Sequence, residues 1–261
     1  MDIKLAKTIA EAAAKETGIL LNENFYKAKG MSSKNKNKGD IVTDIDLKAE
    51  KIILDSIKSH FPDHDILSEE AGDIGNHKSK YLWIVDPIDG TMNYYHGMSP
   101  YRIGIALLED KEPILNVLYN PTKNELYTAT KNGGAFLNGE KITVSNRTDL
   151  KDCVVMFHLS SKKDPRIRTM NILEKICEEA MQVRMLGSTL ASASYIASGR
   201  FDIFFSVQQK AWDIFPGSLL IEEAGGKVTD IKGNKITPES TSVVISNGKV
   251  HDQIIKLLET I

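Results

Sequence analysis

The stretch that most constrains this chain runs from Trp83 to Thr91, where an apolar run leads directly into two carboxylates. The run from Tyr81 to Val85 is typical of a buried strand, and the sequence Asp-Pro-Ile-Asp-Gly at 86–90 predicts a tight turn after it. The residues after Gly90 can open a short helix whose free N–H groups face that turn. The turn is either a solvated strand end or a place where a cation and a phosphate bind together.

Composition places the chain among ordinary globular proteins. Its 261 residues are 41% apolar and 26% charged, with a net charge of −2. We expect one unit over residues 1–261, made of approximate halves 1–150 and 151–261 packed together. Balanced charge argues against a broad nucleic-acid or membrane surface, and the absence of a bilayer-length apolar run or signal core predicts a cytoplasmic protein. Cys153 and Cys177 are predicted to be reduced and buried.

Periodicity predicts helices and strands along the whole chain. Helices are expected over 2–25, from within 40–46 to Pro62, and over 165–181, 190–198, 212–224 and 250–261. Strands are expected over 65–68, 81–85, 103–108, 114–119, 125–129, 135–137, 153–158, 183–186, 201–205, 227–230 and 243–246. The first half therefore contains an antiparallel meander, and strands alternate with helices in the second.

Two polar segments are expected to be loops, 27–39 and 73–80. The first is rich in Lys, Asn and Ser; most of its lysines are expected to be solvated, and Lys36 is the candidate for covering a bound phosphate. Thr43 and Asp46 resemble a capping box at the next helix start. Asp46 is therefore either a helix cap or a catalytic residue.

Four carboxylates lie where ordered elements begin or end. Glu69 follows the strand 65–68, Asp86 and Asp89 follow the strand 81–85, and Asp213 starts a helix that it could simply cap. Mg²⁺ prefers oxygen ligands, often a few carboxylates together with a substrate phosphate and water. Four carboxylates in one place would be costly without cations, because like charges repel.

The motifs resemble those of a known family. Residues 86–94, Asp-Pro-Ile-Asp-Gly-Thr-Met-Asn-Tyr, resemble the first signature of the inositol monophosphatase family, and His96-Gly97 continues it. Trp212-Asp213-Ile214, with Glu-Glu-Ala-Gly-Gly at 222–226, resembles the second. The segment 40–46 and Ser68-Glu69-Glu70, which precede the first signature, and Arg184 with Gly187-Ser188, which lie between the two, fall in the expected order. The resemblance covers nearly the whole chain and implies an α/β (α+β) layered sandwich of alternating helix and sheet layers, assembled as a homodimer.

The resemblance also implies roles for individual residues. The implied ligands of two to three Mg²⁺ ions are Glu69, Asp86, the Ile88 carbonyl, Asp89 and Asp213. The implied catalytic residues are Thr91, oriented by Asp46, together with Glu69. The implied substrate-binding residues are Asp89, Gly90, Thr91, Arg184, Gly187, Ser188, Thr189, Ser206 and Asp213.

The resemblance therefore implies a lithium-sensitive, Mg²⁺-dependent phosphatase of small monoesters. Its first expected substrate is myo-inositol 1-phosphate, hydrolysed by in-line attack of an activated water. Ser206 stands seven residues before Asp213, where the family's inositol enzymes often carry a glutamate. That difference leaves open a broader sugar phosphatase acting on fructose 1,6-bisphosphate or NADP(H). A hypothesis from another functional class is that the chain is a regulatory protein that uses the same fold to engage RNA or a polymerase.

Overall fold

The computed structural model describes residues 1–27, 33–37, 40–76 and 78–259, with the backbone alone at 33–37 and 40–43. Its helices lie close to the predicted segments. They are α1 (Ile3–Asn24), α2 (Asp44–His60), α3 (Thr91–Tyr95), α4 (Lys163–Glu179), α5 (Thr189–Ala197), α6 (Ala211–Glu223) and α7 (His251–Glu259). A 3-10 turn, η2 (Leu150–Asp152), joins the two halves of the chain.

The first half forms a large mixed sheet. Its strands are β3 (Asp65–Ser68), β4 (Gly72–Ile74), β5 (Tyr81–Asp89), β6 (Arg102–Glu109), β7 (Glu112–Asn120), β8 (Glu125–Thr130), β9 (Gly134–Leu137) and β10 (Glu140–Lys141). Their order is β10-β9-β8-β7-β6-β5-β3-β4. The antiparallel meander predicted for residues 101–137 is confirmed. Asp73 and Ile74 of the short strand β4 lie in the segment 73–80, which was predicted to be a loop.

The second half forms a smaller sheet. Its strands are β11 (Val154–Phe157), β12 (Gln182–Arg184), β13 (Ile203–Ser206), β14 (Lys227–Thr229) and β15 (Val243–Ser246), in the order β12-β11-β13-β15-β14. Strand β11 runs parallel to both β12 and β13. The carboxyl ends of these three strands therefore lie at the same edge of the sheet, where open α/β sheets place their ligands.

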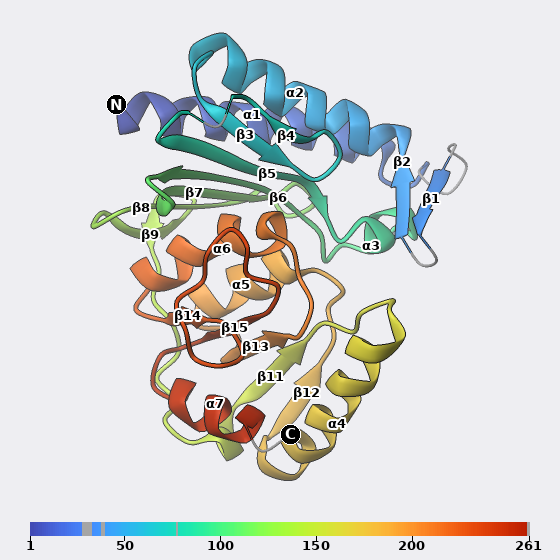
Figure 1. Cartoon of the computed structure of the whole chain (residues 1–261), viewed down its shortest axis with the longest axis vertical. Coiled ribbons are helices and arrows are strands. Elements are labelled where there is room, and N and C mark those ends of the chain that lie inside the picture. Colours follow the sequence, from blue (N-terminus) through green and yellow to red (C-terminus); the bar gives the residue numbers. More distant parts are fainter. Residues whose placement is uncertain (28–32, 38–39, 77, 260–261) are drawn as a thin grey trace.

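Helices and sheets alternate in layers (Figure 1). Helices α1 and α2 cover one face of the large sheet, α5 and α6 lie between the two sheets, and α4 and α7 cover the outer face of the small sheet. The predicted layered fold is confirmed. None of the helices in the described part of the chain is both long enough and apolar enough to cross a membrane.

Burial of β5 on both faces explains its uninterrupted apolar run. Trp83 and Val85 pack into the core under α1 and α2, whereas Ile84 packs into the core shared with α5 and α6. A strand covered on both faces has no polar face, so its sequence shows no alternation. This strand stays buried to its carboxyl end, where it places Asp86 and Asp89.

The polar segment before α2 differs from its prediction. Strands β1 (Ser33–Asn37) and β2 (Asp40–Thr43) form an antiparallel pair, so residues 40–43 are extended and α2 begins only at Asp44. The residues of β1, Ser-Lys-Asn-Lys-Asn, show no hydrophobic alternation that could reveal the pair. The predicted roles of the Lys36 and Thr43 side chains, and the residues 28–32 and 38–39 of the predicted loop, lie outside what the structure describes.

The two cysteines have different environments, and the prediction for Cys177 was wrong. Both are free, Cys153 is buried and Cys177 is exposed. The buried face of α4 is formed by Thr169, Ile172, Leu173 and Ile176. Cys177 directly follows the last of these and therefore lies about 100° around the helix from it, beyond the edge of that face.

Buried His251 makes folding sensitive to acid. Its Nε2 lies 2.9 Å from Thr229 Oγ1 and its Nδ1 lies 2.8 Å from Ser246 Oγ, and burial lowers its pKa to about 4. The unfolded chain binds this proton near pH 6.5, so the free energy of unfolding should fall as pH drops from about 6.5 to about 4. We expect His251→Gln to reduce that fall by on the order of 2 kcal/mol, measured by urea unfolding at pH 7 and pH 4. Equal pH slopes in both proteins would contradict this role.

Candidate metal and phosphate site

The carboxyl end of β5 is irregular, and this irregularity shapes the site. Asp86 pairs with Gly104 and Asp89 pairs with Arg102, so the register shifts between the two aspartates. Pairing thus continues past Val85, where the sequence predicted a turn. Gly90 then adopts a φ of 95°, and a Cβ there would lie 2.9 Å from the Pro100 carbonyl oxygen. Only glycine suits this conformation and this close approach. The predicted short helix follows as α3.

Asp89 connects the two halves of the chain. Its carboxylate accepts the Leu190 N–H at 2.6 Å, the Thr189 N–H at 3.3 Å and the Ser188 hydroxyl. Asp89 therefore lies at the N-terminus of α5, where the helix dipole favours an anion. Burial raises its pKa, and these hydrogen bonds and the positive charge of Arg102 oppose the rise.

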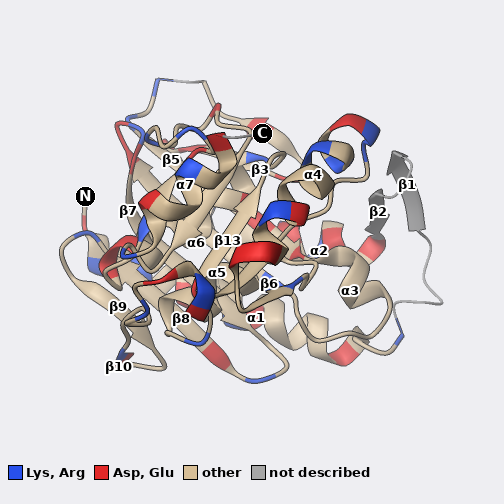
Figure 2. Cartoon of the chain, turned by 90° about the horizontal axis from the view of Figure 1, so that it is seen from below, with Lys and Arg blue, Asp and Glu red and all other residues tan. Residues whose placement is uncertain are grey.

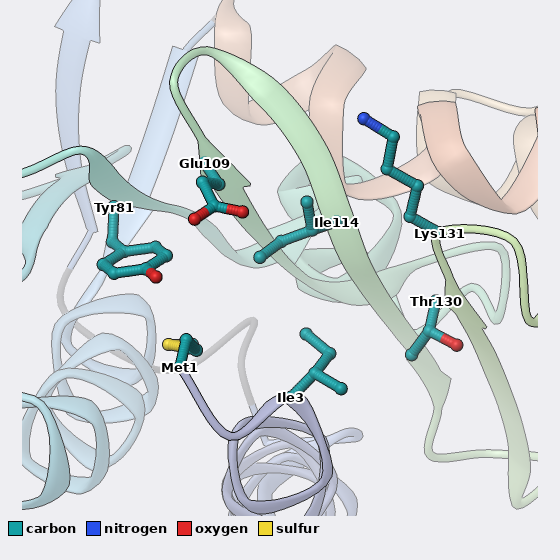
Figure 3. Close-up of a pocket in the computed structure, with 7 residues that line it drawn as sticks. All are labelled: Met1, Ile3, Tyr81, Glu109, Ile114, Thr130 and Lys131. Atoms are coloured by element: carbon teal, nitrogen blue, oxygen red, sulfur yellow. The ribbon is translucent and has the colours of Figure 1, made fainter.

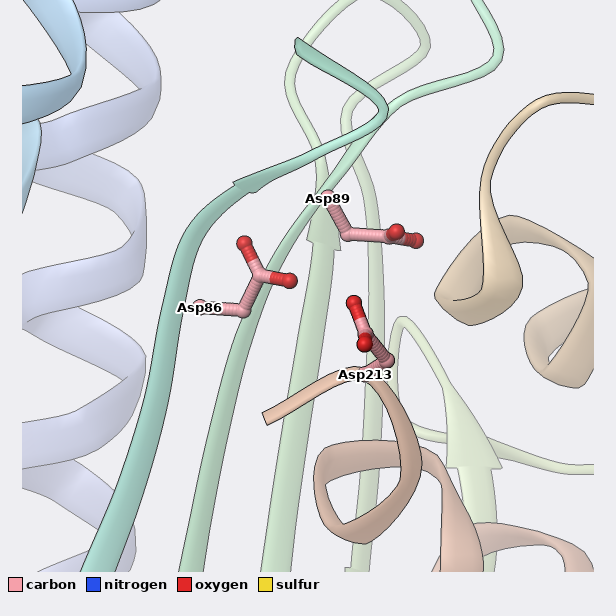
Figure 4. A group of neighbouring side chains, drawn as sticks. All are labelled: Asp86, Asp89 and Asp213. Carbon is pink, nitrogen blue, oxygen red and sulfur yellow. The ribbon is translucent and has the colours of Figure 1, made fainter. Parts of the chain in front are cut away.

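Three aspartates converge at this point (Figure 4). Asp86 and Asp89 come from β5 and Asp213 from the first turn of α6, and each offers an oxygen within 4.8 Å of the others. The pKa of Asp86 is raised well above its usual range, first by burial and then by the negative charges of Glu69, Asp89 and Asp213. The structure thus brings together the four carboxylates that the sequence singled out.

The chemistry of these donors fits a divalent cation. All are hard oxygen ligands, and two of the aspartates are almost fully buried. Buried carboxylates repel one another, and a bound cation stabilises them by neutralising their charge. This attraction also compensates for the free energy lost when the carboxylates are removed from water. The Ile88 carbonyl lies beside them and accepts the Thr91 hydroxyl at 3.0 Å.

Glu50, which the sequence reasoning missed, fixes the turn that carries Glu69. Its buried carboxylate accepts the Glu70 N–H at 3.0 Å, the Ala71 N–H at 3.1 Å and the Ser68 hydroxyl. The residue belongs to α2, so one helix sets the backbone on both sides of Glu69. The only sequence signal for the role of Glu50 is a Glu among the apolar positions of an amphipathic helix. Its hydrogen-bond partners become neighbours only in the fold.

A cavity of about 180 Å³ opens over the carboxylates. It is lined by Glu69, Asp86, Ile88, Asp89, Gly90, Thr91, Met92, His158, Gly187, Ser188, Thr189, Gln209 and Asp213. Most of the predicted site residues are in this group. His158, Gln209 and Met92 were not predicted. His158 could have been found because it directly follows a strand whose carboxyl end reaches the site.

Three predicted residues do not line this cavity. Arg184 is exposed and donates to Gln182 Oε1 and the Val183 carbonyl. Ser206 is fully buried and its hydroxyl donates to the Gln208 carbonyl at 3.0 Å. Asp46 is buried at the start of α2; burial raises the pKa of Tyr94, and the negative charge of Asp46 adds to that rise. Asp46 does not line the cavity, so any role it has in the site acts through other residues.

A second cavity, of about 270 Å³, lies at the opposite end of β5 (Figure 3). It is lined by Met1, Ile3, Tyr81, Glu109, Ile114, Thr130 and Lys131. Its one carboxylate, Glu109, already pairs with Lys80 at 2.6 Å. Its lining thus offers no cluster of oxygen ligands. The cavity that contains the three aspartates is therefore the better candidate for a metal and phosphate site.

Comparison with known proteins agrees with this geometry. The sequence profile of the inositol monophosphatase family matches residues 3–261. The chain is 37% identical to the Nus factor SuhB of Xylella fastidiosa over 95% of this chain and 92% of that protein. It is also 37% identical to a Thermotoga maritima fructose-1,6-bisphosphatase/inositol-1-monophosphatase over 85% and 84%. The crystal structure of the extragenic suppressor protein suhB from Bartonella henselae superposes with a TM-score of 0.93, at 30% identity and 98% coverage of both chains.

Fold and site together define a layered α/β protein with an acidic, metal-compatible cavity between its two sheets. Within that class, the chain belongs to the inositol monophosphatase family. The resemblance in the sequence motifs is thereby confirmed.

Proposed function

We propose that this chain is a Mg²⁺-dependent phosphatase of small phosphate monoesters, with myo-inositol 1-phosphate as its first substrate. The observation that carries this proposal is the convergence of Asp86, Asp89 and Asp213 within 4.8 Å at the base of a cavity. Family membership supports phosphatase chemistry and dependence on a metal. We propose that the two halves act as one catalytic domain, because Asp89 links β5 to α5.

In this proposal the carboxylates hold the ions and the surrounding backbone holds the phosphate. Glu69, Asp86, Asp89, Asp213 and the Ile88 carbonyl are the ligands of two to three Mg²⁺ ions. Bound divalent cations supply positive charge against the phosphate and lower the pKa of water. We propose that the Gly90 and Thr91 N–H groups, at the start of α3, bind phosphate oxygens, and that Gly187, Ser188 and Thr189 contact the alcohol part of the ester.

The water that attacks phosphorus is positioned by side chains of the first half of the chain. Thr91 lines the cavity, and its hydroxyl is held by the Ile88 carbonyl at 3.0 Å. We propose that Thr91, supported by Asp46 and assisted by Glu69, orients this water and takes part in removing its proton. Positioning and charge neutralisation then supply most of the rate, as in other phosphoryl transfers.

Some observations favour two other candidates. Ser206 faces away from the cavity, and a relative is named fructose-1,6-bisphosphatase/inositol-1-monophosphatase, which together favour a broader sugar phosphatase. Relatives named Nus factor SuhB favour a regulatory protein that engages RNA or a polymerase. Against the second, Lys and Arg are interspersed with Asp and Glu over the described chain (Figure 2). A homodimer and a cytoplasmic location remain predictions.

A panel of esters separates these candidates. We expect phosphate release from inositol 1-phosphate in Mg²⁺ with a kcat/KM at least about tenfold above that for fructose 1,6-bisphosphate or NADP. Li⁺ should inhibit this activity. A preference for the bisphosphate would instead identify the broader sugar phosphatase. Stable RNA binding without any phosphate release would favour the regulatory protein.

A further inference from the structure

One wall of the cavity is formed by residues that follow strands of the small sheet, in the second half of the chain. The carboxyl ends of β11 and β13 lie together, and the His158 N–H donates to the Phe205 carbonyl at 3.2 Å. His158 follows β11, and the segment 207–209 follows β13. Both His158 and Gln209 line the same cavity as Asp213. This wall therefore presents polar side chains to a ligand in the cavity.

Within the segment 206–209, only Gln209 lines the cavity. Ser206 is turned inward, with its hydroxyl on the Gln208 carbonyl. The Gln208 side chain accepts the Ser160 hydroxyl at 2.6 Å and does not line the cavity. The polar side chain that this segment presents to a ligand therefore belongs to Gln209.

The structure holds the Gln209 amide in one place. Gln209 is only 6% exposed; its backbone N–H donates to the Thr241 carbonyl at 2.7 Å, and its Nε2 donates to Thr189 Oγ1 at 2.6 Å. A primary amide has two N–H donors and a carbonyl acceptor. One contact to Thr189 uses only part of this capacity, so a fixed, neutral hydrogen-bonding group remains beside the cavity.

We propose that Gln209 is a specificity-determining residue that hydrogen-bonds a hydroxyl of the leaving alcohol. This inference rests on the proposed phosphatase function and refines it to polyol monoesters. The cavity already contains four carboxylates, so a neutral amide binds a hydroxyl without adding further negative charge. Among the described residues that line it, none is Lys or Arg, so a second phosphate would find no ammonium or guanidinium there. A hydroxyl that pairs with a prepositioned amide is strongly selected, because its loss leaves that amide unpaired.

The test compares two esters in Mg²⁺. Inositol 1-phosphate has hydroxyls beside its ester, and 4-nitrophenyl phosphate has none. Gln209→Met keeps the length of the side chain and removes its polar atoms. We expect this variant to raise KM for inositol 1-phosphate at least about tenfold, with kcat nearly unchanged, and to leave kcat/KM for the aryl ester within about twofold.

Gln208→Met is the matched control, because the neighbouring amide faces Ser160 rather than the cavity. It should leave both esters unaffected, and retained aryl ester hydrolysis shows that each variant is folded. An unchanged KM for inositol 1-phosphate in Gln209→Met, or equal losses on both esters, would overturn the specificity role. Hydrolysis of neither ester by the wild-type protein would overturn the phosphatase proposal itself, and the role of Gln209 with it.

Discussion

Asp213→Asn should lower turnover by at least about 10³-fold while changing the unfolding temperature by no more than about 3 °C. Asp213 Oδ2 accepts the Lys210 N–H at 2.7 Å, and an asparagine keeps an oxygen for that bond. The substitution removes one negative charge from a crowded cluster, so it relieves repulsion on Asp86. The free energy of unfolding should therefore change little, whereas the proposed ion site loses the negative charge of one ligand.

Glu222→Gln provides the matched control for this prediction. Glu222 lies on the same helix, α6, is exposed and does not line the cavity, so losing its charge should be tolerated. Phosphate release from inositol 1-phosphate and thermal unfolding should be measured for both variants. Retention of more than about a tenth of the activity by Asp213→Asn would argue strongly against the assigned metal ligand.

Glu50→Ala should lower the free energy of unfolding by about 2–4 kcal/mol and also weaken activity. The change leaves the Glu70 and Ala71 N–H groups and the Ser68 hydroxyl without their shared acceptor. An unpaired buried donor costs about 1–3 kcal/mol, and water entering the site recovers part of it. The turn that carries Glu69 then loses its fixed position.

Glu50→Gln distinguishes positioning from simple destabilisation. It keeps the shape of the side chain and one oxygen acceptor, so its stability should lie between that of the wild-type protein and that of Glu50→Ala. If Glu50 acts by placing Glu69, the Mg²⁺ concentration needed for half-maximal activity should rise in both variants at a temperature where both are folded. An unchanged Mg²⁺ dependence would limit Glu50 to a purely structural role.

Much of the fold follows from local apolar patterns, even in short elements. The strand 65–68 and the strand 243–246 were predicted with the bounds that the structure shows. The pair β1 and β2 was missed because β1 is polar throughout and β2 has no apolar alternation with a period of two. The exposure of Cys177 was missed because one helical position decides between the buried and the exposed side of α4.

The site was less accessible to sequence reasoning where it depends on tertiary contacts. A single motif holds Asp86 and Asp89, but the approach of Asp213 depends on how α6 packs against the large sheet. Ser206 and Gln209 are three residues apart, and only the loop conformation decides which of them lines the cavity. Periodicity cannot reveal a buried charge such as Arg102, whose charge opposes the rise in the Asp89 pKa, because its neighbours come from distant strands and helices.

Direct titration of the protein with Mg²⁺ in a calorimeter tests the central claim. The carboxylates gathered at the end of β5 should bind Mg²⁺ saturably in the wild-type protein, and Asp213→Asn should weaken that binding at least about tenfold. Glu222→Gln should bind as the wild-type protein does. Failure of the wild-type protein to take up Mg²⁺, or equal uptake by Asp213→Asn, would contradict the account.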